Sequence, residues 1–338
     1  MTFSNNAKPL VSLCITCYNQ AKYIRESIQS AFDQTYSPLE IVVSDDCSTD
    51  GTDKIVEEMF SGYHGQHKLI FNRNSSNLFV AKNYEKAFKL AHGEILVTGA
   101  GDDISMPNRV ETIVAAWAKS NGDVECIMHG FERIDQDGVV YDVSGPWSVE
   151  MPLGAAMAYR CDVFKKFDIQ SDENVLYEDN IFVIRALLLG KVLSMPDSLI
   201  KWRTGGYSTR DDFRKRRVRN AKTVLRTNEY IQSELLRYGK SFEDDKIKEA
   251  KLVLERRRRR YETELGVFEG RTFVGRGISF SRMKPENWWF DSPGVKMLTY
   301  GRYVPPFGLG FLVPIFVKVV VKLRLARILR WCKRLFRK

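Results

Sequence analysis

The sequence predicts an α/β protein with a mostly parallel central sheet, and two observations carry this prediction. Between residues 10 and 119, short apolar runs alternate with amphipathic segments at the spacing of strand–helix–strand units. The runs are apolar at consecutive positions, as in strands that helices cover on both faces. Right-handed crossovers between such strands place their carboxyl ends at one edge of the sheet, where α/β proteins bind ligands.

The individual elements follow from the spacing of apolar residues and turn residues. Strands are expected at residues 10–16, 39–44, 68–71 and 95–98, and helices at residues 23–32, 52–60, 80–91 and 107–119. The alternation stops after a strand at residues 124–128, because the next segment indicates a hairpin around Asp137-Gly138. Beyond it the pattern predicts a helix opening near Tyr177, a strand at residues 199–202, and long helices at residues 213–238 and 245–265.

Two adjacent carboxylates, Asp102 and Asp103, follow the fourth expected strand. Gly99-Ala100-Gly101 precedes them and leaves room for a ligand to approach the backbone. Adjacent acids repel one another, so the pair indicates a neutralising cation. Oxygen ligands without nearby His or Cys favour Mg²⁺ or Mn²⁺ over zinc. The alternative is that one of the two acids only caps a helix that begins at Pro107.

Size and composition indicate a full hydrophobic core. The chain has 338 residues with 44% apolar content, which suits a domain of about 200 residues with additions. Its six cysteines are scattered, as expected for reduced packed thiols, and Cys14-x-x-Cys17 lacks the second pair that a zinc site needs. The polar stretch Met1–Pro9 shows no signal peptide, so we expect the chain to begin in the cytoplasm.

Positive charge is concentrated at one end of the chain. Residues 292–338 contain eleven Lys and Arg and no acid, whereas residues 1–291 carry 41 basic and 42 acidic side chains. Apolar residues recur at helical spacing from Val321 to Phe336, with basic residues between them, which is typical of a helix lying in an anionic membrane interface. The five arginines at residues 256–260 indicate a solvated face, or else a contact with lipid headgroups or an acidic acceptor.

Several motifs recur in one order along the first two thirds of the chain. They are Cys14-Ile15-Thr16-Cys17-Tyr18-Asn19, Ser44-Asp45-Asp46-Cys47-Ser48-Thr49-Asp50-Gly51, Asn77 through Asn83, Ala91-His92-Gly93-Glu94 and Gly101-Asp102-Asp103. This order resembles the family-2 glycosyltransferases, which are inverting enzymes of the GT-A fold that use nucleotide sugars. The resemblance covers about residues 10 to 209 and implies a GT-A domain followed by a helical, basic extension.

The resemblance implies a donor site at the carboxyl edge of the sheet. Thr16, Tyr18 and Asn19 would flank the nucleotide, and Asp46 would bind the base. Lys82 would reach the ribose or diphosphate. Asp103 would be the principal ligand of Mg²⁺ or Mn²⁺, with Asp102 beside it in the same site. From the residues alone, Asp45 and Asp46 could equally form a turn and cap the next helix.

The resemblance also implies an acceptor side, where Asp179 would be the catalytic base and Glu178 would orient the acceptor. Acids at the start of a helix are otherwise common as caps or partners of the helix dipole. The sequence departs from the family at Ala100, where a further Asp is frequent, and at Gly205, where a His is frequent. The first departure leaves the metal with one protein ligand, and diphosphate oxygens and water would complete its shell. The second leaves the role of the His to Arg203, Ser208 or the metal alone.

The leading hypothesis is an inverting glycosyltransferase that moves a sugar from a nucleotide diphosphate sugar, with UDP expected, to a hydroxyl of a lipid-linked saccharide. The setting would be surface-polysaccharide or O-antigen-type assembly. The alternative is a non-catalytic protein of the same fold that anchors a polysaccharide assembly complex, which the departures at Ala100 and Gly205 favour. Nucleic acid is not an expected partner, because the basic end lacks interleaved stacking aromatics.

Three parts are expected along the chain: residues 1–209 as the GT-A domain, residues 210–291 as a helical extension, and residues 292–338 as a basic amphipathic membrane-interface segment. This organisation predicts a cytoplasmic enzyme bound peripherally to the cytoplasmic face of the inner (plasma) membrane, through an anionic lipid surface.

Removal of residues 303–338 should therefore release the protein from anionic vesicles. The deletion removes nine of the eleven localised positive charges, each worth about 1 kcal/mol near such a surface, together with the amphipathic segment. Co-sedimentation of full-length and truncated protein with vesicles across a salt series measures this effect. Equal sedimentation of the two forms, or insertion of the full-length protein that resists carbonate, would contradict the prediction.

Overall fold

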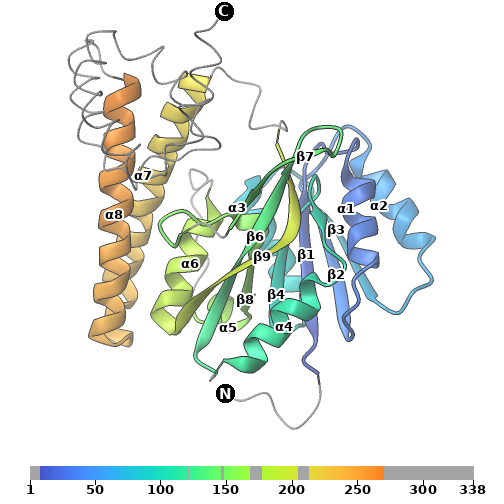
Figure 1. Cartoon of the computed structure of the whole chain (residues 1–338), viewed down its shortest axis with the longest axis horizontal. Coiled ribbons are helices and arrows are strands. Elements are labelled where there is room, and N and C mark those ends of the chain that lie inside the picture. Colours follow the sequence, from blue (N-terminus) through green and yellow to red (C-terminus); the bar gives the residue numbers. More distant parts are fainter. Residues whose placement is uncertain (1–7, 121, 146–147, 168–176, 205–212, 270–338) are drawn as a thin grey trace, which may run out of the picture. The chain divides into compact units, whose positions relative to one another are not determined.

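The computed structural model describes residues 8–120, 122–145, 148–167, 177–204 and 213–269. A single mixed sheet forms its centre (Figure 1). The strands are β1 (Val11–Cys17), β2 (Leu39–Asp45), β3 (Lys68–Arg73), β4 (Ile95–Ala100), β5 (Ile104–Ser105), β6 (Val124–Ile134), β7 (Val140–Ser144), β8 (Met157–Arg160) and β9 (Lys191–Arg203). The α-helices are α1 (Ile24–Phe32), α2 (Thr52–Ser61), α3 (Phe79–Leu90), α4 (Arg109–Lys119), α5 (Asp162–Lys165), α6 (Glu178–Leu189), α7 (Phe213–Tyr238) and α8 (Asp244–Glu269), and short 3₁₀ turns cover Gly154–Ala156 and Gly239–Ser241.

The strand order is β3-β2-β1-β4-β8-β6-β9-β5, and β7 pairs with β6. The four strands β3, β2, β1 and β4 are mutually parallel, as the alternating pattern predicts. Beyond β4 the sheet changes character, because β8 runs antiparallel to both β4 and β6, while β6 and β9 are parallel. The sequence pattern correctly marks this change as the point after residue 124 where the strand–helix alternation ends.

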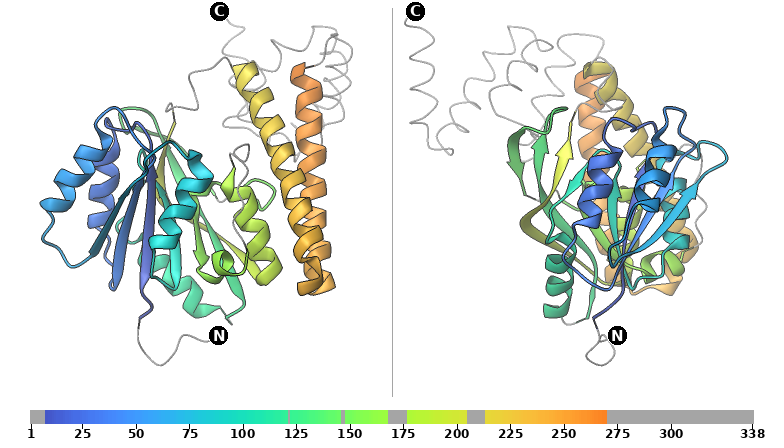
Figure 2. Two further views of the ribbon diagram at one scale, coloured as in Figure 1. Left: turned by 180° about the vertical axis from the view of Figure 1, so that it is seen from behind. Right: turned by 90° about the vertical axis from the view of Figure 1, so that its right-hand side faces the viewer.

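Helices cover both faces of the sheet (Figure 2). On one face, α1, α2 and α4 bury apolar residues against odd-numbered side chains of β1 and β2, with Ile28, Val56 and Trp117 among the buried residues. On the other face, α3, α5 and α6 pack against Cys14, Val42 and neighbouring strand residues. Burial on both faces accounts for the uninterrupted apolar runs of β1, β2 and β4, which are buried along nearly their whole length.

Most expected elements occur within two residues of their predicted bounds, but β6, β9 and α8 extend further, α8 to Glu269 rather than residue 265. The strand expected at residues 199–202 is β9, which begins at Lys191 and continues through Pro196 by irregular pairing with β6. The helix expected to begin at Pro107 begins at Arg109 with Asn108 before it, so neither Asp102 nor Asp103 caps it. The strand expected at residues 124–128 extends to Ile134 and forms the first strand of the predicted hairpin.

The five described cysteines carry free thiols, as expected from their scatter. Cys14 and Cys17 lie in β1 and are buried. Burial raises the pKa of both thiols, and a nearby acid raises it further in each case, Glu40 for Cys14 and Asp45 for Cys17. The side chains are therefore protonated packing groups rather than metal ligands.

The described part of the chain divides into two compact units. Residues 222–258 belong to the same unit as the sheet, whereas residues 217–221 belong with residues beyond 258. In the first unit, α7 and α8 contribute Ile231, Leu235 and Leu254 to the core that also holds α6. In the second unit, Arg217 forms an ion pair with Glu264.

The helices expected at residues 213–238 and 245–265 are present as α7 and α8. Among the described helices, none combines the length and the apolar content that a membrane crossing requires. The basic segment at residues 292–338 lies outside the described residues, so its helix and its membrane contact stay predictions. The three-part division of the chain stays a prediction as well.

A buried ion pair joins α6 to α7. Arg185 donates from Nε and Nη2 to the carboxylate of Glu234, and Tyr230 Oη donates to Glu234 Oε1 at 2.9 Å. The side chains of Arg185 and Glu234 are 2% and 9% exposed. This pair fixes the orientation of α6 because both charges are removed from water and depend on each other.

We expect Glu234→Ala to lower the free energy of unfolding by about 3–5 kcal/mol, since it leaves Arg185 buried without its partner. Glu58→Ala is the matched control, because it breaks the exposed pair with Arg25 and should cost less than about 1 kcal/mol. Urea denaturation of the two variants measures the difference. Similar losses in both would show that the buried pair does not hold α6 in place.

Candidate active site

The register of the parallel strands gathers the predicted donor residues at one edge. Thr16 lies opposite Ser44 and Ala100, and Cys17 lies opposite Asp45. Backbone hydrogen bonds extend this alignment past the strand ends, from Asp46 N to Cys17 O at 2.9 Å and from Gly101 N to Thr16 O at 2.9 Å. The loops that carry Asn19, Asp46 and Asp102 therefore begin side by side.

Asp45 and Asp46 have different roles although they are adjacent. Asp45 accepts hydrogen bonds from the backbone N–H and the hydroxyl of Ser48, so it forms the turn that the sequence offered as an alternative. Asp46 instead accepts from Asn74 Nδ2 at 2.9 Å and from Leu78 N at 2.8 Å, both on Oδ1. Within the described chain, no hydrogen bond reaches Asp46 Oδ2, so this oxygen can accept one from a ligand.

The other residues predicted to bind the donor differ in their exposure and in their hydrogen bonds. Thr16 is buried, and Tyr18 is partly exposed. Asn19 has a left-handed backbone (φ 52°), and its Oδ1 accepts from Thr49 N at 2.8 Å, so it shapes the loop before α2. Lys82, in the first turn of α3, is half-buried, and no hydrogen bond or ion pair joins it to another described residue. Its ammonium group is available to an anion.

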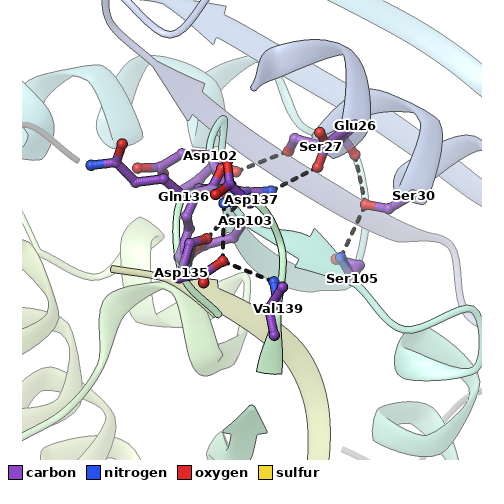
Figure 3. A network of polar contacts seen from close by, with 12 residues as sticks. Glu26, Ser27, Ser30, Asp102, Asp103, Ser105, Asp135, Gln136, Asp137 and Val139 are labelled. Carbon is purple, nitrogen blue, oxygen red and sulfur yellow. Dashed lines mark hydrogen bonds and ion pairs between the residues drawn. The ribbon is translucent and has the colours of Figure 1, made fainter. Parts of the chain in front are cut away.

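The Asp102–Asp103 loop is held by residues from the far end of the sheet (Figure 3). Strand β5 follows the loop directly and pairs with β9, with Ile104 opposite Lys201. This pairing brings the backbone N–H of Arg203 to Asp103 Oδ1 at 2.9 Å, across 100 residues of sequence. On the other side, Ser27 Oγ donates to Ala100 O at 2.9 Å, and Ser105 N donates to Ser30 Oγ at 3.0 Å.

The guanidinium of Arg203 makes contacts that the sequence does not indicate. It donates from Nε to Asp102 O at 3.0 Å, and from Nη1 to the carbonyl oxygens of Asp135 and Gln136 at 3.1 Å each. Its Nη2 pairs with Glu26 Oε2 at 2.7 Å, and its charge lies 4.5 Å from the centre of the Tyr23 ring. The side chain is 1% exposed. Arg203 therefore clamps the loop, and its three nitrogens all face protein groups rather than a ligand.

Electrostatics distinguish Asp103 from Asp102. Asp103 is buried, and burial together with the charge of Asp102 holds its pKa well above the usual range. The pKa of Asp102 is raised as well, chiefly by burial, while the Arg203 charge opposes the shift. Asp103 Oδ2 is fully buried and has no hydrogen-bond partner in the described residues. An unpartnered carboxylate oxygen of this kind fits a cation ligand.

A buried arginine, Arg109 of α4, adds positive charge beneath this loop. It donates to Ser105 Oγ, to His129 Nε2, and to the carbonyl oxygens of Thr98 and Ala155. Burial lowers its pKa to about 9, and the charge of Asp103 is one of the influences that oppose this lowering. Arg109 thus remains charged near neutral pH and helps to balance the loop acids.

The second acid pair, Glu178 and Asp179, lies in the first turn of α6 and is also buried. Asp179 Oδ2 accepts from Gly154 N at 3.1 Å, and Oδ1 accepts from the backbone and side-chain nitrogens of Asn180. A Cβ at Gly154 would lie 2.8 Å from Glu178 Oε1, so a larger residue there would force the Glu178 carboxyl group to shift. No side chain caps α6, so the capping alternative does not describe this pair.

Burial raises the pKa of Asp179 from 3.8 to about 6. The pKa of Glu178 is raised well above 4.5, by burial first and by the charge of Asp179 second. The proton is therefore favoured on Glu178 over Asp179, whose pKa of about 6 leaves it ionised near neutral pH. A carboxylate whose pKa lies just below neutrality is suited to proton acceptance.

Tyr84 of α3 relates the two acid pairs. Its hydroxyl donates to Gly99 O at 2.7 Å, at the end of β4. Burial raises the pKa of Tyr84, and the charges of Glu178 and then Asp103 raise it further. Arg109 links the two pairs as well, because it donates to Ser105 Oγ after the Asp102–Asp103 loop and to Ala155 O, next to the Gly154 whose N–H binds Asp179.

Sequence patterns missed several residues of this site. Glu26 and Tyr23 of α1 hold Arg203, and Asn74 and Asn83 hold the loop around Asp46. A hydrogen-bond network between distant segments leaves no local spacing to detect. Phe79, at the start of α3, is unusual for its backbone rather than for a hydrogen bond. It has φ 65°, which is rare for a bulky residue, and 50% of its surface is exposed.

A separate hollow of about 700 Å³ opens between the carboxyl ends of α1 and α2, lined by Phe32, Tyr63 and His67 among others. The acid loop contacts the opposite end of α1, at Glu26 and Ser27. The hollow therefore does not form part of the site.

The central sheet with its flanking helices has the GT-A fold. Two solved structures share the fold. One is a mannosyltransferase from Pyrobaculum calidifontis in complex with GDP-Man and Mn²⁺ (17% identity, 88% of this chain and 83% of that chain covered, TM-score 0.58). The other is residues 1–349 of TarS from S. aureus in complex with UDP-GlcNAc (20% identity, 88% and 82% covered, TM-score 0.51).

The sequence comparison identifies the family. Residues 12–166 match the sequence model of glycosyl transferase family 2. An uncharacterised glycosyltransferase of Nostoc sp. is 26% identical over 251 residues, which cover 68% of this chain and 76% of the relative. The predictions of a family-2 glycosyltransferase and of the GT-A fold are therefore confirmed.

Proposed function

We propose that the chain is an inverting glycosyltransferase that moves a sugar from a UDP-sugar to a hydroxyl of a lipid-linked saccharide. The observation that carries this proposal is the presence of two acid pairs that Arg109 links, one containing buried Asp103 beside the predicted nucleotide residues and one buried at the start of α6. The pairs differ in state, since Asp103 Oδ2 lacks a partner and Asp179 has a pKa of about 6. One pair suits a cation and the other suits proton transfer.

Donor binding is supported by the residues around Asp46. Asp46 Oδ2 is available to accept the imide N–H of a uracil base, and the Lys82 ammonium is available to the diphosphate. Tyr18, partly exposed at the same edge, can contact the nucleotide. Structures of the same fold bind UDP-GlcNAc and GDP-Man, which supports a nucleotide sugar as the donor.

A divalent cation, Mg²⁺ or Mn²⁺, fits this site through Asp103. Among the described residues, no group of three His, Cys, Asp or Glu side chains could hold a metal ion alone. The rest of its shell would therefore come from diphosphate oxygens and water, which these ions accept. When bound, such a cation offsets the negative charge that develops on the departing diphosphate.

Asp179 serves as the base in a single displacement. Its carboxylate takes the proton of the acceptor hydroxyl as that oxygen attacks the anomeric carbon and the bond to the diphosphate breaks. Burial and the charge of Asp179 raise the pKa of Glu178, which favours the protonated form that can donate a hydrogen bond to the acceptor. Hydrogen bonds from Gly154 and Asn180 keep the Asp179 side chain in one orientation.

The acceptor and location follow from the basic end of the chain. Eleven Lys and Arg within residues 292–338, with no acid among them, support attachment to the cytoplasmic face of an anionic membrane. A lipid-linked saccharide lies in that same surface, so attachment would bring enzyme and acceptor together. Surface-polysaccharide assembly is the process that uses such acceptors.

The metal assignment predicts that Asp103→Asn lowers metal-dependent hydrolysis of a UDP-sugar at least about 100-fold, since charge stabilisation by a metal is worth several kcal/mol. The amide keeps an oxygen to accept the Arg203 N–H but loses the charge, so the fold should persist. Asp102→Asn is the control and should cost less. Titration of Mn²⁺ in the presence of UDP gives a second readout, and full activity in excess chelator would refute the assignment.

The base assignment predicts that Asp179→Asn lowers kcat about 100-fold or more while the affinity for UDP stays near wild type, because general-base catalysis contributes 10²–10⁴. In the wild type, kcat/KM should fall as the pH drops through about 6, because protonated Asp179 cannot accept a proton. Weakened UDP binding with unchanged kcat would instead place Asp179 in the donor site.

A further inference from the structure

The run of five arginines at residues 256–260 is not a uniform solvated face, because two neighbours in it differ sharply. Arg256 is exposed and lies 3.4 Å from Glu150 Oε1 at the surface. Arg257, the next residue of α8, has no exposed surface and is among the largest fully buried side chains. Desolvation of a guanidinium is costly, so its position indicates a specific role.

Arg257 reaches two separate chain segments and one further helix. Its Nη2 donates to Val149 O at 2.9 Å, and its Nε donates to Glu150 O at 3.2 Å. Its Nη1 donates to Asn180 O and to Asn228 Oδ1 at 3.3 Å each. One buried cation thus joins the segment before Gly154, the first turn of α6, and α7.

Two of these segments, the one before Gly154 and the first turn of α6, also carry the groups that donate hydrogen bonds to Asp179. Gly154 N donates to Asp179 Oδ2, and Asn180 donates to Oδ1. Arg257 binds the carbonyl of Asn180 and the carbonyls of residues four and five positions before Gly154. A shift of Arg257 would therefore move both sets of Asp179 donors.

We propose that Arg257 is a positioning residue for the transfer reaction, which sets the orientation and the charge of the Asp179 carboxylate from the helical extension. This inference rests on the proposed function, because it takes Asp179 as the base. It extends the active site into α8, beyond residues 12–166 that match the family and beyond residue 209 where the motif resemblance ends.

The charge of Arg257 acts on Asp179 in a defined direction. Burial raises the pKa of Asp179, and among the opposing influences the Arg257 charge lowers it. The other titratable groups around Asp179 are Glu178 in the same turn, Tyr159 of β8, and Tyr84 of α3, which interacts with Glu178. Burial raises the pKa of all three and so disfavours their negative charges, and Arg257 supplies the positive charge.

The test compares Arg257→Gln and Arg257→Lys with the matched control Arg256→Gln, in the full chain. For Arg257→Gln we expect the acid limb of kcat/KM for UDP-sugar hydrolysis to move up by about one pH unit, since removal of a nearby opposite charge shifts a pKa by this order. Arg257→Lys keeps the positive charge, so the acid limb of its kcat/KM profile should stay at the wild-type pH. Its kcat should fall about 10-fold, because lysine cannot make all the hydrogen bonds of the guanidinium. Arg256→Gln should match the wild type.

Affinity for UDP, measured by calorimetry, serves as the folding readout in each variant and should not change. An unmoved acid limb in folded Arg257→Gln would overturn the proposal, and so would an equal shift in Arg256→Gln. If Arg257→Gln fails to fold, Arg257→Lys still decides, because wild-type kcat in that variant would overturn the positioning role. Failure of the proposed function looks different, since Asp179→Asn itself would then retain full kcat.

Discussion

The burial of adjacent carboxylates at one sheet edge is the constraint on which the rest of this structure depends. Burial and mutual repulsion oppose ionisation of Asp103 beside Asp102, and the chain must offset this cost. It does so with the Arg203 N–H on Asp103 Oδ1, the Arg203 guanidinium on the loop backbone, and the Arg109 charge below. These groups come from β9 and α4, so the paired sheet has to form before the loop has a fixed shape.

The same physical problem recurs at Glu178 and Asp179 and is solved differently. No arginine binds either carboxylate directly in the hydrogen bonds of the described residues. Instead the pKa of Glu178 is raised, Asp179 accepts three N–H groups, and Arg257 binds the neighbouring backbone. Positive charge placed directly at the Asp102–Asp103 loop suits a site that holds a cation. At Asp179 no arginine binds the carboxylate, so this group can gain and lose a proton.

Much of the fold could be predicted because strands β1 to β4 are encoded locally, as apolar runs with turn residues between them. The acid pairs could be found for the same reason, since each is contiguous in sequence. The roles of Asp45 and Asp46 could not be separated, because only the tertiary contacts with Asn74 and Leu78 distinguish them. Arg203 and Arg257 were misjudged for a related reason. Both occur in polar or basic stretches, and only long-range packing shows that they are buried.

The two halves of the site depend on different parts of the chain, and this has a physical consequence. The donor half rests on parallel strand ends whose alignment is fixed by adjacent hydrogen-bonded ladders. The acid pair of α6 rests on longer-range contacts, through the Arg185–Glu234 pair to α7 and through Arg257 to α8. Loosening α7 and α8 would therefore disturb Asp179 before it disturbs Asp46. The proposed base is therefore held by the helical extension, whereas the proposed donor residues are held by the sheet.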